Sequence, residues 1–192
     1  MKVLTLNTET FEKESLKLIS KLEVNPDLVV GILSGGGHVL EAIKQHPNVK
    51  SSLFEVVTLQ RQSTNVKQRF LKPVLSILPY SILNWLRILE SNSVKAKISN
   101  LDLEKLQDNI IAFDTVNTIA KPIKNMLIID DAIDSGKTMF VVKNNLQQKF
   151  PKAKIKIAVL AWTIDSSIIK PDYYLYNNTL LRFPWSNDYK RK

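Results

Sequence analysis

The hydrophobic residues of this chain follow two spacings, one typical of buried strands and the other of amphipathic helices. Residues 9–22 carry apolar side chains at helical spacing among charged residues, which predicts a helix that ends before Asn25-Pro26. Residues 28–33 form a short apolar run, rich in β-branched side chains and followed by three glycines, as expected of a buried parallel strand. By the same criteria, further strands are predicted at residues 53–59, 109–114, 125–129, 155–162 and 173–177, and helices at 39–45, 101–107 and 138–150. Strands that alternate with helices predict a doubly wound α/β domain with a mainly parallel sheet, whose ligands bind at the carboxyl ends of the strands.

One segment, at about residues 61–108, does not fit this alternation and is predicted to be a basic helical insertion. Residues 70–89 are strongly apolar but contain Pro73 and Pro79, which predicts two or three short helices rather than one long helix. Between residues 61 and 97 there are seven basic residues and only one acidic residue, Glu90. We therefore expect residues 66–97 to form a helical hood or lid beside the ligand site. The alternatives are a solvated basic face over an ordinary core, a subunit contact, and a membrane or nucleic-acid contact.

Composition limits the classes of protein to which this chain can belong. Its 192 residues, 44% of them hydrophobic, suffice for one core, so residues 1–192 are predicted to form a single domain. The absence of cysteine excludes disulfides, cysteine-ligated zinc and thiol catalysis. No transmembrane segment is expected, because a span needs about 20 apolar residues and the longest uncharged run of this chain is shorter. The start of the chain lacks the apolar region of a signal peptide, so a cytoplasmic location is expected. The net charge of +9 favours an anionic partner.

The strongest chemical signal lies in residues 127–138, where an apolar strand runs into two adjacent acids and then a turn that opens a helix. Asp130 and Asp131 follow the predicted strand, where carboxylates can accept hydrogen bonds from a vicinal diol, directly or through metal-bound water. Residues 134–138 present the free amides and the positive dipole end of the next helix, which together bind a phosphate group. The simpler interpretation, a helix cap beside two solvated acids, is disfavoured because all these features rarely coincide. A nucleotide-binding P-loop is disfavoured as well, because Asp131 occupies the position of its first glycine.

This stretch closely resembles the phosphoribosyl-pyrophosphate binding motif of the type I phosphoribosyltransferases. Residues 26–36 look like that family's first strand and pyrophosphate loop, and residues 170–174 and 183–185 look like the C-terminal signatures of its xanthine, guanine and hypoxanthine branch. These similarities cover most of the chain outside residues 61–108. They imply the type I phosphoribosyltransferase fold and a magnesium-dependent enzyme of purine salvage. Such an enzyme joins a purine-like base to the ribose 5-phosphate of phosphoribosyl pyrophosphate (PRPP) and releases pyrophosphate.

The resemblance also implies roles for individual residues. Asp130 and Asp131 would hold the ribose hydroxyls and, through water, Mg²⁺, while Asp134 would act as general acid/base toward the purine ring. The expected contacts of the 5-phosphate are Asp134, Ser135, Gly136, Lys137 and Thr138. Those of the pyrophosphate are Ser34, Gly35, Gly36 and Arg61, and those of the base are Thr163, Leu180 and Leu181.

Four positions depart from the family pattern. Ser34 stands where relatives usually carry Arg or Lys, although the glycines after it still permit close approach of the backbone. Thr163 falls near a lysine that contacts the exocyclic oxygen of oxopurines. Leu180 aligns with the usual base-stacking aromatic residue and Ser186 with a usual acid. Trp185 matches the family, and we expect it in the core rather than against a base.

These departures leave three hypotheses open. The leading hypothesis is a transferase acting on PRPP and a purine-like base. The second is a PRPP-sensing regulatory or nucleic-acid-binding protein on the same fold, and the third is a transferase for a non-purine acceptor. A homo-oligomer, either a dimer or a tetramer, is expected in each case. His38 and His46 have no partners at ligand spacing, so no metal role is predicted for them.

Overall fold

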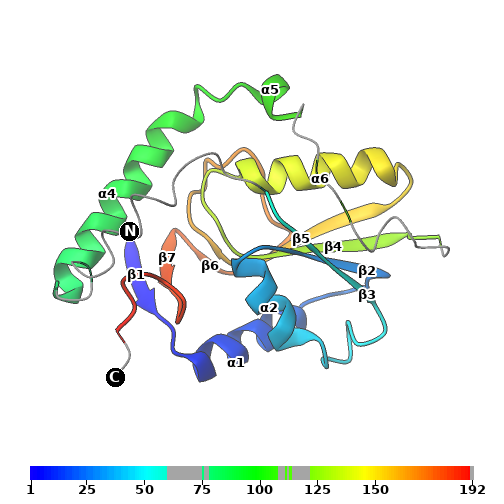
Figure 1. The fold of residues 1–192 in the computed structure, drawn as a ribbon, viewed down its shortest axis with the longest axis horizontal. Coiled ribbons are helices and arrows are strands. Elements are labelled where there is room, and N and C mark those ends of the chain that lie inside the picture. Colours follow the sequence, from blue (N-terminus) through cyan, green and yellow to red (C-terminus); the bar gives the residue numbers. More distant parts are fainter. Residues whose placement is uncertain (60–74, 76–77, 108–110, 112, 114–121, 191–192) are drawn as a thin grey trace.

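The computed structural model describes residues 1–59, 75, 78–107, 111, 113 and 122–190 of the chain, and Figure 1 shows their arrangement. The described strands are β1 (Lys2–Thr5), β2 (Leu28–Ile32), β3 (Leu53–Val57), β4 (Asn125–Ile133), β5 (Lys154–Trp162), β6 (Tyr173–Asn177) and β7 (Thr179–Arg182). The described helices are α1 (Thr8–Ile19), α2 (Gly35–Ile43), α4 (Tyr80–Ile98), α5 (Leu103–Gln107) and α6 (Lys137–Lys149).

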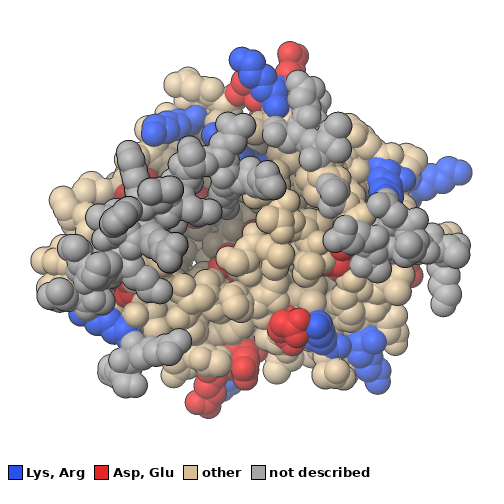
Figure 2. Space-filling view, in the orientation of Figure 1, with Lys and Arg blue, Asp and Glu red and all other residues tan. Residues whose placement is uncertain are grey.

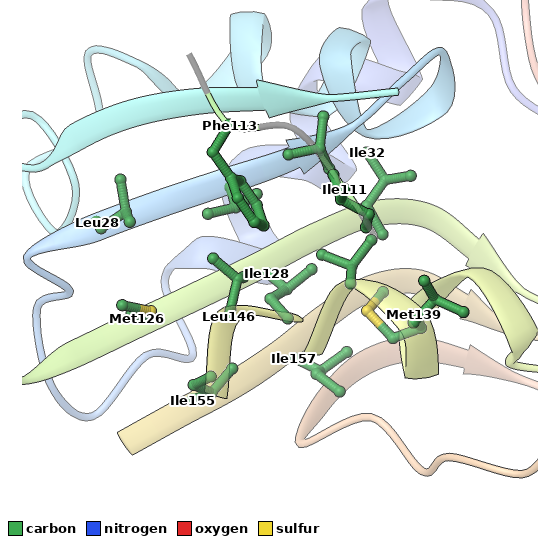
Figure 3. Close-up of a cluster of buried hydrophobic side chains, with 14 of the residues drawn as sticks. Leu28, Ile32, Ile111, Phe113, Met126, Ile128, Met139, Leu146, Ile155 and Ile157 are labelled. Atoms are coloured by element: carbon green, nitrogen blue, oxygen red, sulfur yellow. The ribbon is translucent and has the colours of Figure 1, made fainter. Parts of the chain in front are cut away.

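The main sheet has the strand order β3-β2-β4-β5-β6, and every neighbouring pair is parallel. Successive side chains of a strand point to opposite faces of the sheet, and both faces are buried. Leu28 and Ile128 belong to a core cluster with side chains of α6, shown in Figure 3, whereas Val29 and Leu127 belong to a cluster with side chains of α1 and α2. Helices on both faces of a parallel sheet confirm the predicted doubly wound α/β fold.

Several predicted boundaries shift in ways that matter for the site. β4 continues to Ile133, beyond the predicted end at residue 129, so Asp130 and Asp131 lie within the strand rather than after it. α2 begins at Gly35, so the three glycines form the first turn of a helix instead of a loop. The strand predicted at residues 109–114 falls mostly outside the described residues. Of the two that are described, Ile111 and Phe113 are buried in the core but belong to no strand.

A second, two-stranded sheet joins the two ends of the chain and was not predicted. β1 and β7 are parallel, with Val3 opposite Leu180 and Thr5 opposite Arg182. Each strand has only four residues, which is too short for a periodic hydrophobic pattern to stand out. The sheet forms because distant segments meet, so only the tertiary structure reveals it.

The described part of the insertion is helical and is interrupted at Pro79, as predicted: Leu75 is helical before the break, α4 follows it, and α5 comes later, but α4 is longer than the short helices expected. α4 has 19 residues and starts directly after Pro79, where the missing N–H of proline costs nothing. In Figure 1 it extends from beside β1 and β7 toward α5, and α5 contacts α6. Residues 60–74, 76 and 77, which include much of the predicted hood, lie outside the described residues. In the described part of the chain, no helix combines the length and apolarity needed to cross a membrane.

Candidate functional site

The strand order places a switch point between β2 and β4, which are neighbours in the sheet. From β2 the chain passes through α2 to β3 on one side, and from β4 it passes through α6 to β5 on the other side. α2 and α6 cover opposite faces of the sheet, so the connections diverge and leave a crevice at the carboxyl ends of β2 and β4. In open α/β sheets ligands bind at such a crevice, because no connection crosses it.

The N-terminus of α6 opens at this crevice with unfilled hydrogen-bonding capacity. Its cap residue, Gly136, has φ 85° and makes no side-chain cap, and the first turn of the helix contains no acid. By contrast, Asn7 caps α1 by accepting a hydrogen bond from the Thr10 amide at 2.8 Å. The Lys137 amide makes only a long hydrogen bond, to the Ser135 hydroxyl at 3.5 Å, so this helix end can still bind an anion, and the helix dipole adds positive potential there.

Gly136 is required by its surroundings as well as by its backbone angle. A Cβ at this position would come within 3.0 Å of the Ile169 side chain and 3.2 Å of the Ile168 side chain. The loop is also tied to that segment, because the Ile168 amide donates a hydrogen bond to the Ser135 carbonyl at 3.0 Å. The predicted phosphate loop is thus held in place by residues that follow β5.

The N-terminus of α2 lies on the other side of the crevice and packs against the acids of β4. Ser34 precedes this helix without a side-chain cap, and the peptide between Leu33 and Ser34 is cis. A side chain at Gly35 would overlap the carboxylate of Asp131, and one at Gly36 would overlap the Ile129 carbonyl. The glycines therefore allow α2 to approach β4, which brings the two predicted pyrophosphate and ribose segments together.

Asp131 has an unusual electrostatic environment. Burial, followed by the charge of nearby Asp134, raises the pKa of Asp131 to about 6, although hydrogen bonds to its carboxylate, among them one from Trp185, act in the opposite direction. Asp130 accepts a hydrogen bond from the Asp131 amide at 2.9 Å. Asp134 is exposed at the start of the loop. The structure thus brings the three predicted acids together in a negative cluster, in which Asp130 and Asp131 are half-buried and Asp134 is exposed.

Sequence reasoning missed the aromatic group that supports Asp131. Trp185 is stacked on Phe183 with ring centroids 4.9 Å apart and on His38 with centroids 4.1 Å apart, and Phe11 meets it edge-on at 4.8 Å. Trp185 is half-buried and packs against the core, as expected, but its indole N–H also bonds Asp131. No local signal connects these residues, because they come from α1, α2, β4 and the segment after β7.

The predicted base contacts lie on two elements that face α4. Thr163 follows β5, is 1% exposed and donates its amide to the Ile133 carbonyl at 2.9 Å. Leu181 of β7 is buried in the core, and its carbonyl already accepts a hydrogen bond from Arg87 of α4 at 3.0 Å. Leu180 is half-buried. Of the three, Leu180 therefore has the most accessible side chain.

α4 is fixed to this region by a buried ion-pair network. Asp188 accepts hydrogen bonds from Arg87 and from Arg182, which is 1% exposed, and Arg182 also donates to Asn84 of α4 at 2.8 Å. Further along α4, Lys95 lies 3.4 Å from Asp165 in the segment after β5. In Figure 2, which has the orientation of Figure 1, a hollow opens near the centre of the molecule and an acidic side chain lies inside it.

Two predicted site features are not located by the structure. Arg61, one of the expected pyrophosphate contacts, lies outside the described residues. Among the described residues, no group of three His, Cys, Asp or Glu side chains could hold a metal ion by itself.

A strand switch point with two open helix N-termini and acids between them defines an α/β protein built to bind an anionic, hydroxyl-bearing ligand. Residues 6–189 match the phosphoribosyl transferase domain family, and the chain belongs to this family. The match confirms the predicted family and, at that level, the prediction of a phosphoribosyltransferase enzyme. No curated protein sequence matches the chain.

Solved structures share the fold over nearly the whole chain. A purine phosphoribosyltransferase from Pyrococcus horikoshii is 20% identical with a TM-score of 0.56, and the match covers 96% of this chain and 94% of that one. A xanthine-guanine-hypoxanthine phosphoribosyltransferase from Helicobacter pylori is 18% identical with a TM-score of 0.57, and the match covers 95% of this chain and 91% of that one. A hypothetical protein from Neisseria gonorrhoeae with bound ppGpp is 15% identical with a TM-score of 0.57, and the match covers 96% of this chain and 89% of that one.

Proposed function

We propose that this chain is a magnesium-dependent phosphoribosyltransferase that joins a purine-like base to the ribose 5-phosphate of PRPP and releases pyrophosphate. The observation that carries the proposal is the pair of helix N-termini, from α2 and α6, at one crevice with Asp130 and Asp131 between them. PRPP has the matching layout, because its two phosphate-containing groups flank a ribose with two adjacent hydroxyls. The α6 loop would hold the 5-phosphate, and Ser34, Gly35 and Gly36 would hold the pyrophosphate.

The acids divide the chemistry between them. Asp130 and Asp131 would accept hydrogen bonds from the ribose hydroxyls, which orients the anomeric carbon. As the bond from that carbon to pyrophosphate breaks, a bond to a ring nitrogen of the base forms, and Asp134 would take the proton that this nitrogen loses. Its exposed position at the start of the loop leaves its carboxylate accessible to the base.

The residues present fit Mg²⁺. The two carboxylates of β4 offer hard oxygen ligands but are too few to hold the ion alone, and Mg²⁺ typically completes its shell with water and substrate phosphate oxygens. When bound, Mg²⁺ would supply positive charge that stabilises the pyrophosphate leaving group.

The acceptor side supports an altered base pocket. Thr163 and Leu181 have buried side chains, and the Thr163 amide and the Leu181 carbonyl are already hydrogen-bonded, so Leu180 would be the main contact and would offer the base an aliphatic surface in place of a ring. This neutral lining is also the observation that favours the second candidate, a PRPP-sensing protein without turnover.

Calorimetric titration with PRPP and MgCl₂, followed by a screen of bases for pyrophosphate release, tests the proposal. We expect binding, release with at least one base, and a roughly 10²–10⁴-fold lower turnover for Asp134→Asn with PRPP affinity retained. Asp102→Asn, at an exposed site on the turn before α5, is the matched control and should change neither quantity. Binding without release for any base would support the sensor, and absence of PRPP binding would reject both candidates.

A further inference from the structure

His38 is an exposed residue of α2 whose ring stacks on Trp185. Its amide donates a hydrogen bond to the Ser34 carbonyl at 3.4 Å, so His38 closes the first turn of the helix. Side chains of a helix lean toward its N-terminus, so the ring leans toward the end of α2 that opens at the crevice. The imidazole lies nearly parallel to the indole of Trp185, with centroids 4.1 Å apart and an interplanar angle of 22°. This contact depends on a flat ring, which another aromatic side chain could also supply.

Three aromatic rings fix the indole of Trp185. Phe183 stacks on it with centroids 4.9 Å apart and planes inclined by 2°, and Phe11 meets it edge-on at 4.8 Å. Two rings that both stack on one indole at these distances cannot share a face without overlapping, so His38 and Phe183 hold Trp185 between them. Phe183 is buried and His38 is exposed. The indole is therefore clamped between a core ring on one face and a surface ring on the other.

The clamped indole reaches the crevice through its N–H, which bonds the carboxylate of Asp131. A hydrogen bond weakens steeply when its donor turns away from the acceptor, so a tilt of the indole would loosen this carboxylate. Gly35, three residues before His38, packs against the same carboxylate. The first turn of α2 thus contacts Asp131 directly through Gly35 and supports it indirectly through the stack of His38 on Trp185.

We propose that His38 is a positioning residue for the ribose contact, because its ring holds Trp185 in the plane from which the indole N–H bonds Asp131. This inference rests on the proposed function of the crevice, in which Asp131 accepts hydrogen bonds from the ribose hydroxyls. It gives the first turn of α2 a part in binding the sugar, in addition to the pyrophosphate contacts proposed for its backbone.

The test compares a ligand that reaches Asp131 with one that does not. Calorimetry in MgCl₂ measures the affinity of ribose 5-phosphate and of pyrophosphate for the wild type, His38→Ala and His38→Phe. We expect His38→Ala to weaken ribose 5-phosphate roughly 2- to 10-fold, the value of one aromatic pair, without changing pyrophosphate. His38→Phe keeps a ring that can stack, so it should bind ribose 5-phosphate as tightly as the wild type.

A double-mutant cycle tests whether His38 acts through Trp185. Trp185→Phe already lacks the N–H that bonds Asp131, so adding His38→Ala to it should cause no further loss of ribose 5-phosphate affinity. Glu41→Ala is the matched control, because Glu41 is exposed on the same helix and pairs only with Lys44, one turn away. It should change the affinity of neither ligand, and thermal unfolding checks that each variant folds.

Several outcomes would overturn the role of His38. Equal weakening of both ligands by His38→Ala, or no weakening of either, would separate His38 from the ribose contact. Failure of His38→Phe to restore binding would remove the stack as the cause, and additive losses in the double variant would show that His38 does not act through Trp185. If His38→Ala did not fold, the stack would be purely structural. Failure of ribose 5-phosphate to bind the wild type would instead reject the proposed function itself.

Discussion

Asp188→Asn should destabilise the protein by about 3–5 kcal/mol, the usual cost of breaking a buried ion pair from one side. The carboxylate of Asp188 accepts hydrogen bonds from Arg87 at 2.6 and 2.7 Å and from Arg182 at 2.9 Å. The Arg182 side chain is 1% exposed, so it cannot turn to water when its partner becomes neutral. The asparagine amide would replace at most one acceptor oxygen and would place a donor beside a second guanidinium.

Thermal and urea unfolding measure this loss. For a chain of this length each kcal/mol lowers Tm by about 2–4 °C, so Asp188→Asn should lower it by about 6–20 °C. Asp165→Asn is the control, because its pair with Lys95 is half-exposed, with side chains 50% and 53% accessible. That variant should stay within about 1 kcal/mol of the wild type. A loss below about 1 kcal/mol for Asp188→Asn would refute the reasoning that this network fixes α4 to β7.

The same pair has a pH signature. Burial by itself raises the pKa of Asp188, but hydrogen bonds and charges of Arg87 and Arg182 outweigh it, so the pKa lies below its ordinary value of 3.8. Because the pKa is lower in the folded state than in the unfolded state, the stabilisation is fully present above pH of about 4 and is lost as pH falls through the folded-state pKa. The difference in unfolding free energy between the wild type and Asp188→Asn should therefore be constant from about pH 5 to 8 and shrink below about pH 4.

Three further predictions concern the crevice. Asp131→Asn should weaken PRPP binding by roughly 10- to 100-fold in calorimetry, because an amide presents a donor where a diol or metal-bound water needs a charged acceptor. Unchanged affinity would reject the proposed contact of Asp131 with the ribose. Gly136→Ala should lower the free energy of unfolding, measured in urea, by about 1–2 kcal/mol and also weaken PRPP binding, since φ is 85° and the added Cβ meets Ile169 at 3.0 Å. A fully stable variant with normal affinity would contradict this requirement for glycine. Trp185→Phe keeps an aromatic ring but removes the N–H that bonds Asp131, so PRPP affinity should fall roughly 2- to 10-fold with little change in Tm. A lower Tm with unchanged PRPP affinity would show that Trp185 is purely structural.

The insertion illustrates both what local sequence reasoning predicts and where it stops. Pro79 breaks the helical segment between Leu75 and α4, as predicted, but α4 then runs without interruption to Ile98 and is longer than the short helices expected. Proline is disruptive inside a helix and harmless at its start, and the pattern alone does not say which applies. The side chains that dock α4, such as Arg87 and Asn84, find partners near the C-terminus that no spacing rule relates to them.

The sequence by itself determined the fold class, the family and the place of the turn that we propose binds phosphate. Each depends on residues that are close together in the chain, since an apolar run, two acids and the turn at residues 134–138 form one continuous signal. Only the tertiary structure decided that Gly35 packs on Asp131 and that Trp185 bonds the same carboxylate. Those relations join segments far apart in the chain, and they arise because parallel strands bring their carboxyl ends to one edge of the sheet while β1, β7 and α4 close over it.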